Sequence, residues 1–170
     1  MKPLRVQFIH GLEGSPQGAK ARLFAEHFEA LTPAMDTGDF AACVELHART
    51  LMDFQPDVLV GSSFGAAVAV DLLRRDAWQG PTLLLAQAVL AFDPQVELPR
   101  GIRIWLAHGL RDEVIDPEAS RRLARTGTPE LVRLIEVDDD HSLHGMVSSG
   151  ELVALVHELC AAGPPGPHRP

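Results

Sequence analysis

Short runs of apolar residues without polar alternation recur along this chain. Val58-Leu59-Val60 and Leu83-Leu84-Leu85 are the clearest examples, and segments with a helical pattern separate such runs. A strand that is apolar on both faces must be covered on both faces, which a parallel sheet between two layers of helices provides. The sequence therefore predicts a single-domain α/β fold with a mostly parallel sheet flanked by helices.

The apolar runs predict about six strands, with helices between them. The strands are expected near Arg5–His10, Pro33–Met35, Asp57–Val60, Thr82–Ala86, Arg103–Ala107 and Val132–Val137. The helices are expected near Gly18–Leu31, Ala41–Phe54, Gly65–Trp78, Pro117–Arg125 and Val147–Ala161. We expect the strand order 2-1-3-4-5-6 in chain numbering, because it puts the loops after the first and third strands across the switch point of the sheet, where open α/β sheets form their sites.

Composition narrows the class of protein and its partners. The chain has 170 residues, 46% of them apolar and 22% charged, which fits one soluble globular domain. The net charge of −8 without a basic cluster argues against nucleic acid and anionic membranes as partners. No apolar segment has the length of a membrane span or the form of a signal peptide, so we expect a cytoplasmic protein. Cys43 and Cys160 lie in helical patterns and are expected to be small buried hydrophobic residues.

Gly61-Ser62-Ser63-Phe64-Gly65 follows one of the apolar runs and opens a helical segment. A serine at the tip of a strand-to-helix turn takes a strained conformation, and glycines two positions before and after it let strand and helix approach each other. The glycine spacing selects Ser63 over Ser62. We therefore predict a nucleophile elbow with Ser63 as the nucleophile, and a glycine-rich turn without chemistry is the alternative.

A serine hydroxyl needs a base, and the base needs a carboxylate to orient it. His141 follows the last predicted strand, and Asp112 follows the fifth, so we predict a Ser63-Asp112-His141 triad. His144 is the alternative base. Asp116, which precedes Pro117, reads better as a helix N-cap than as the carboxylate, and Glu113 is a weaker alternative.

The oxyanion of such a reaction needs two preorganised N–H donors. The first is expected from the backbone of Phe64, directly after the nucleophile. The second is expected from the glycine-flanked loop after the first strand, where we choose Leu12 and consider Glu13 as the alternative. Glycines let such a loop turn its N–H groups inward.

With the motifs His10-Gly11, Gly61-x-Ser63-x-Gly65, His108-Gly109-x-x-Asp112-x-x-Ile115 and Asp140-His141, the chain resembles the α/β-hydrolase superfamily over nearly all of residues 4–160. The segments His10–Pro16 and Ala19–Arg22 resemble those of small lidless bacterial serine esterases. The resemblance implies a minimal hydrolase domain over residues 1–162 and a serine esterase that needs no metal or organic cofactor. Residues 163–170 are expected to be a disordered tail. Compared with the fuller family pattern, we expect a fold without the first two antiparallel strands and without the cap domain of larger relatives.

Residues 87–101 are too few for a helical lid between the fourth and fifth predicted strands. We therefore expect an open, shallow site for small soluble acyl esters or thioesters, without interfacial activation. From loop position, we expect the pocket to be lined by His10, Glu13, Leu90, Phe92, Leu143 and His144. Leu12 and Phe64 are expected to add to its apolar wall.

Other functions remain open at this point. A thioesterase or amidase would use the same residues, a lyase or perhydrolase can use the same fold, and a binding or scaffold protein can retain it without catalysis. The run Asp138-Asp139-Asp140 is expected to be a solvated acidic loop, because no metal-ligand spacing accompanies it. His10 and His108 are expected to hold loops by hydrogen bonds, and His27, His47 and His157 to be surface or structural residues.

Overall fold

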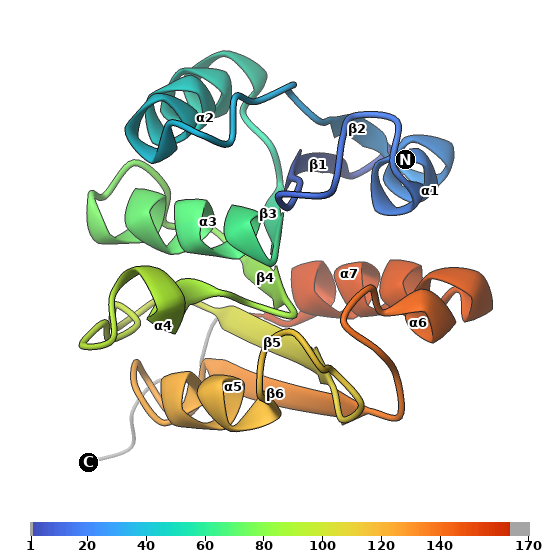
Figure 1. Cartoon of the computed structure of the whole chain (residues 1–170). Coiled ribbons are helices and arrows are strands. Elements are labelled where there is room, and N and C mark those ends of the chain that lie inside the picture. Colours follow the sequence, from blue (N-terminus) through green and yellow to red (C-terminus); the bar gives the residue numbers. More distant parts are fainter. Residues whose placement is uncertain (1, 164–170) are drawn as a thin grey trace.

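The computed structural model describes residues 2–163 and contains a six-stranded parallel sheet in the order β2-β1-β3-β4-β5-β6, as predicted (Figure 1). The strands are β1 (Arg5–Ile9), β2 (Glu29–Leu31), β3 (Val58–Ser62), β4 (Thr82–Leu85), β5 (Ile104–Gly109) and β6 (Val132–Val137). Residues 164–170 of the expected tail lie outside the described part of the chain.

Two layers of helices cover the sheet (Figure 1). One layer is formed by α1 (Ala19–His27), α6 (His144–Ser149) and α7 (Glu151–Ala161), and the other by α2 (Phe40–Phe54), α3 (Phe64–Arg74), α4 (Val89–Phe92) and α5 (Pro117–Ala124). Val58 and Val60 of β3 pack into the first layer, whereas Leu59 packs into the second. Both faces of the central strands are therefore buried, which explains their unbroken apolar runs.

The second strand was predicted in the wrong place. Helix α1 ends at His27 instead of continuing to Leu31, because Phe28 turns to an extended conformation and buries its ring against the core. The strand follows at once as Glu29–Leu31, which pairs with β1, and Pro33–Met35 is not a strand. This strand lies at the edge of the sheet and is mostly exposed, so it carries no apolar run that the sequence would reveal.

The predicted last helix is two helices. Gly150 takes a left-handed conformation with φ 82° and separates α6 from α7. The segment between β4 and β5 also contains a single helical turn, α4, that was not predicted. The other predicted boundaries agree to within four residues.

Helix starts follow the chemistry of their caps. The side chain of Asp39 accepts from the N–H of Ala42 at the start of α2, and Asp116 accepts from Glu118 at the start of α5 with Pro117 at the first helical position. Asp116 is thus the N-cap that the sequence indicated. Within residues 2–163, no helix is both long enough and apolar enough to cross a membrane.

Candidate active site

Ser63 stands at the sharp turn between β3 and α3, with φ 54° and ψ −113°. Two glycines make this turn possible. A Cβ on Gly65 would lie 2.0 Å from the carbonyl oxygen of Ile9, and a Cβ on Gly61 would lie 2.5 Å from that of Gly65. Because no side chain fits at either position, β1, β3 and α3 can approach each other closely only through glycine. The backbone thus has the strand-turn-helix geometry that the sequence predicted.

The two serines of the turn differ in their surroundings. Ser62 is the last residue of β3, is buried, and pairs in register with Leu85 of β4. Ser63 is half-buried, and its Oγ lies 3.2 Å from Nε2 of His141. Ser63 is therefore the serine whose hydroxyl faces a base.

The carboxyl ends of β3, β5 and β6 bring Ser63, Asp112 and His141 together. Nδ1 of His141 lies 2.7 Å from Oδ2 of Asp112. An ionised carboxylate can only accept, so Nδ1–H donates and the lone pair of Nε2 faces the Ser63 hydroxyl. An imidazole held in this way is placed to take the proton of the serine. His144, the alternative base, makes no side-chain contact with Ser63 among the contacts of the described chain.

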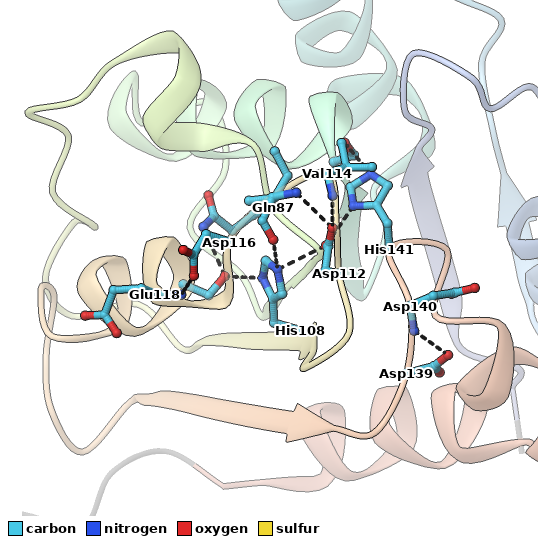
Figure 2. A network of polar contacts seen from close by, with 12 residues as sticks. Gln87, His108, Asp112, Val114, Asp116, Glu118, Asp139, Asp140 and His141 are labelled. Atoms are coloured by element: carbon cyan, nitrogen blue, oxygen red, sulfur yellow. Dashed lines mark hydrogen bonds and ion pairs between the residues drawn. The ribbon is translucent and has the colours of Figure 1, made fainter.

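Four donors surround the buried carboxylate of Asp112 (Figure 2). The backbone N–H groups of Val114 and Ile115 donate to Oδ1, each at 2.8 Å. His141 and His108 approach Oδ2, at 2.7 and 3.1 Å. Burial alone would raise the pKa of Asp112, but the bonds from Ile115, His141 and Val114 outweigh it and hold the pKa below its usual value. Asp112 is therefore kept as a carboxylate facing His141.

A chain of hydrogen bonds behind Asp112 fixes the tautomer of His108. The N–H of Val89 donates to Oε1 of Gln87 at 2.8 Å, so Nε2 of Gln87 donates to Oγ of Ser120 at 3.0 Å. Nε2 of His108 faces two acceptors, the carbonyl of Ile115 at 3.0 Å and Oδ2 of Asp112 at 3.1 Å, so it carries the proton. Nδ1 of His108 then accepts from the Ser120 hydroxyl, which lies at 2.7 Å. His108 holds its loop, as expected, and adds a donor to the carboxylate.

Asp139 corrects the expectation of a solvated acidic loop at residues 138–140. Its side chain is buried and accepts from the N–H groups of Asp140, Gly145 and Met146. Burial would raise the pKa of Asp139, but these three bonds outweigh it and lower the pKa. The carboxylate ties the loop that carries His141 to the start of α6, so it fixes the position of His141. Asp138 is exposed and pairs with Arg111, and Asp140 is partly buried.

The loop after β1 lies against the elbow. The N–H of Gly14 donates to the carbonyl of Gly11 at 3.1 Å, so Leu12 and Glu13 occupy the middle of a tight turn. A Cβ on Gly11 would lie 3.2 Å from the carbonyl oxygen of Ser62, which shows how close the loop backbone comes to the nucleophile turn. Phe64 is the first residue of α3, where backbone N–H groups have no helical acceptor. These are the positions from which the two oxyanion donors were predicted.

A cavity of about 600 Å³ opens in front of Ser63 and His141. Its walls include four of the residues expected there, namely Leu12 and the pocket candidates His10, Glu13 and His144. The first turn of α1 also lines the cavity, including Lys20, which the sequence did not single out. Val114 also lines the cavity.

Four residues that were expected to line the pocket do not line this cavity in the described structure: Leu90, Phe92, Leu143 and Phe64. Leu90 and Phe92 belong to α4 on the other side of the elbow, where the ring of Phe92 packs against Phe40 and Phe64. Leu143 is completely buried in the core between the sheet and α6. The prediction that these side chains line the pocket was wrong, because loop position tells which end of the sheet a residue occupies but not which face it joins.

The remaining expectations about individual residues have mixed outcomes. His47 is structural but completely buried, and Nε2 of Gln7 donates to its Nδ1 at 3.0 Å. Cys43 is buried as expected, whereas Cys160 is partly exposed, and both thiols are free. No group of three or more metal-ligating side chains occurs among residues 2–163.

Solved structures of other proteins share the fold of this chain, although no sequence comparison finds a relative. No protein-family model and no curated protein matches the sequence. A protein from Xanthomonas campestris described as a hydrolase of the alpha/beta superfamily aligns with a TM-score of 0.74 and 22% identity, over 94% of this chain and all of that one. Est1E from Butyrivibrio proteoclasticus aligns with a TM-score of 0.68 and 15% identity, over 95% and 90% of the two chains. An esterase from Pyrococcus furiosus aligns with a TM-score of 0.66 and 15% identity, over 93% and 82%. The chain therefore has the α/β-hydrolase fold.

Proposed function

We propose that this protein is a serine hydrolase that cleaves small acyl esters through a covalent acyl-enzyme. The observation that carries the proposal is the continuous contact from Oγ of Ser63 through His141 to Oδ2 of Asp112, at 3.2 and 2.7 Å. A binding protein would need none of these three groups, and it would gain nothing from the strained backbone at Ser63.

In the first step, Oγ of Ser63 attacks the ester carbonyl and forms a bond to its carbon while Nε2 of His141 takes the hydroxyl proton. Asp112 holds the imidazole in orientation and stabilises its positive charge. The negative charge that develops on the carbonyl oxygen is assigned to the N–H groups of Phe64 and Leu12. His141 then gives its proton to the departing alkoxide, the C–O bond breaks, and the acyl group remains on Ser63.

In the second step, water takes the place of the alcohol. His141 removes a proton from the water as its oxygen bonds to the acyl carbon, and then returns the proton to Oγ of Ser63 as the acid leaves. Every proton that moves is carried by His141. The carboxylate of Asp112 stays ionised throughout, consistent with the four donors around it.

The open cavity supports small acyl esters as substrates. Leu12 and Val114 line it with exposed apolar side chains, which suit a short acyl chain. The triad would serve thioesters and amides equally well, so the choice of leaving group is an outcome of the substrate panel rather than a separate function. Panels of short oxygen esters, thioesters and anilides give that answer through their relative kcat/KM values.

Covalent labelling tests the proposal most directly. A fluorophosphonate should add once to the wild-type protein, as seen by intact mass, and should not add to Ser63→Ala. Ser62→Ala is the matched control, because it removes the adjacent hydroxyl and should keep both labelling and ester hydrolysis. Failure of the folded wild type to label, or loss of labelling in Ser62→Ala alone, would overturn the assignment of Ser63.

A further inference from the structure

Lys20 lies in the first turn of α1 and lines the same cavity as Ser63 and His141. Its side chain is only half-exposed. Burial lowers the pKa of its ammonium group, although the charges of Asp140 and Asp139 act in the opposite direction. A cation in such a place loses hydration, and it recovers that loss only if an opposite charge or a set of acceptors meets it.

Within the described chain, the charges of Asp139 and Asp140 act on Lys20 without forming an ion pair with it. None of the ion pairs or side-chain hydrogen bonds among residues 2–163 includes it. The acidic loop that faces it is engaged elsewhere. Asp139 accepts from three backbone N–H groups, Asp138 pairs with Arg111, and Asp140 accepts from the N–H of His144. The positive charge is thus left available to whatever enters the cavity.

The wall of the cavity combines apolar side chains with a few ionisable ones. Leu12 and Val114 contribute apolar side chains that are 60% and 68% exposed. The other ionisable side chains on its wall are Glu13, on the exposed loop beside Leu12, and the histidines His10, His141 and His144. Among the described residues that line the cavity, Lys20 is the only lysine or arginine. An anion that enters therefore finds one permanently basic side chain, that of Lys20.

We propose that Lys20 forms a subsite for a carboxylate carried by the substrate, so that esters with a negative charge remote from the scissile bond are hydrolysed faster than their neutral counterparts. The proposal rests on the hydrolase function proposed above and specifies its substrate class. The carboxylate would meet the ammonium group while the apolar part of the ester lies against Leu12 and Val114.

The test compares two esters that differ only in the charge at one end. The 4-nitrophenyl monoester of adipic acid carries a carboxylate, and the ester of adipamic acid carries a neutral amide of the same shape. The wild type should prefer the anionic ester by about tenfold in kcat/KM at low salt, because a charge pair in a partly desolvated site is strengthened well above its value in water. The preference should shrink as ionic strength rises.

Variants separate the cavity lysine from the overall charge of the protein. Lys20→Met should bring the preference close to one, because kcat/KM for the anionic ester falls by more than kcat/KM for the neutral ester, and Lys20→Glu should reverse the preference. Arg22→Met is the matched control, because Arg22 is exposed on the same helix, does not line the cavity, and its loss changes the net charge equally. Arg22→Met should keep the preference.

A purely structural lysine gives a different pattern. If Lys20→Met lowers kcat/KM for both esters equally, or if the wild type shows no preference between them, the subsite proposal is wrong, whereas the proposed ester hydrolysis still stands. If Lys20→Met does not fold, Lys20→Gln and the salt dependence of the wild type give the same comparison. Labelling rates of a carboxylate-bearing and a neutral fluorophosphonate provide a reading without turnover. Absence of any labelling would overturn the hydrolase function itself, and the subsite with it.

Discussion

Ser63 holds φ 54° and ψ −113° because its neighbours leave no alternative. Its N–H donates to the carbonyl of Leu85 at 2.8 Å, and its own carbonyl accepts from Ala88 at 3.2 Å. A residue with a Cβ is strained here by roughly 1–3 kcal/mol. The turn therefore has a serine at a position where glycine would adopt the same backbone conformation without strain.

This strain gives a prediction at Ser63 itself. Both Ser63→Gly and Ser63→Ala should lack hydrolysis, but Ser63→Gly should be the more stable of the two by about 1 kcal/mol, because glycine adopts positive φ without cost. Urea unfolding of the two variants at neutral pH measures the difference. Equal stabilities, or a more stable alanine variant, would show that the backbone of the elbow is not strained in solution.

The hydrogen-bond chain behind Asp112 gives a second prediction at single-residue scale. In Gln87→Glu the new side chain can still accept from Val89 but can no longer donate to Ser120. The Ser120 hydroxyl is then drawn toward the glutamate, and Nδ1 of His108 gains a proton. We expect kcat to fall about tenfold, because a charged His108 would compete with His141 for the carboxylate of Asp112.

Nitrogen-15 spectra of the histidine side chains provide the readout that a merely structural change would not give. They should show His108 protonated on Nε2 alone in the wild type and on both ring nitrogens in Gln87→Glu. Gln87→Met removes both of its hydrogen bonds without adding an acceptor and serves as the control. Unchanged His108 shifts in the glutamate variant would contradict the assignment.

Sequence order was sufficient to select Ser63, Asp112 and His141 as a group, because the three residue types follow three apolar runs in the order that the elbow requires. It was not sufficient for Lys20, Gln87 or Leu143. Their roles depend on which face of a helix or loop turns toward the site, and that direction is decided by packing rather than by position in the chain.

At the scale of secondary structure elements, α3 meets β1 at Gly65, where a Cβ would have the least room of all the described glycines. A Cβ at this position would lie 2.0 Å from a backbone oxygen that cannot move without breaking the sheet. Gly65→Ala should therefore lower the free energy of unfolding by roughly 3 kcal/mol or more, or prevent folding. Gly38→Ala is the control, because its Cβ would meet only a side-chain oxygen of Asp36 at 3.2 Å. Similar unfolding midpoints for the two variants would contradict the close packing of the elbow.

Helix α2 is joined to β1 through the buried contact between His47 and Gln7. Burial lowers the pKa of His47 to about 4, with a smaller effect from His10. Between about pH 6.5 and pH 4 the unfolded chain binds a proton that the folded chain does not. Stability from this group is therefore fully present above the unfolded value and is lost as the pH falls toward 4.

The resulting prediction concerns the slope of stability against pH. From pH 7 to pH 5 the free energy of unfolding of the wild type should fall by about 2 kcal/mol more than that of His47→Met. Urea titrations of both proteins at the two pH values measure this. The methionine variant should be less stable at neutral pH, because Gln7 loses a partner. Only the difference in slopes tests the buried histidine, and parallel slopes would refute it.

Elements were predictable from the sequence to the extent that they are buried. The runs that became β3, β4 and β5 are covered on both faces, so their composition records their position. The strand β2 is exposed at the sheet edge, and the break between α6 and α7 depends on a single glycine in a left-handed conformation. Neither leaves an apolar pattern, so neither is visible in the periodicity of the sequence.

At the scale of the whole molecule, the strand order follows from one topological requirement. The loops after β1 and β3 meet where the chain changes direction across the sheet, and those loops carry the residues around Leu12 and Ser63. The same order leaves the segment between β4 and β5 free to hold a lid. Here it contains only the short helix α4, whose aromatic residue Phe92 packs beside the elbow rather than over the cavity.

This arrangement predicts simple kinetics toward poorly soluble esters. Leu12 and Val114, two apolar residues of the cavity wall, are already 60% and 68% exposed, so no segment has to move to uncover them. The rate on 4-nitrophenyl butyrate should follow one hyperbola through the solubility limit, without the jump that an oil–water interface produces when it opens a lid. A lipase with a lid, assayed in parallel, supplies the positive control. A jump in rate at the onset of emulsion would mean that part of this chain closes over the cavity in solution, and the open site would then be one of two states.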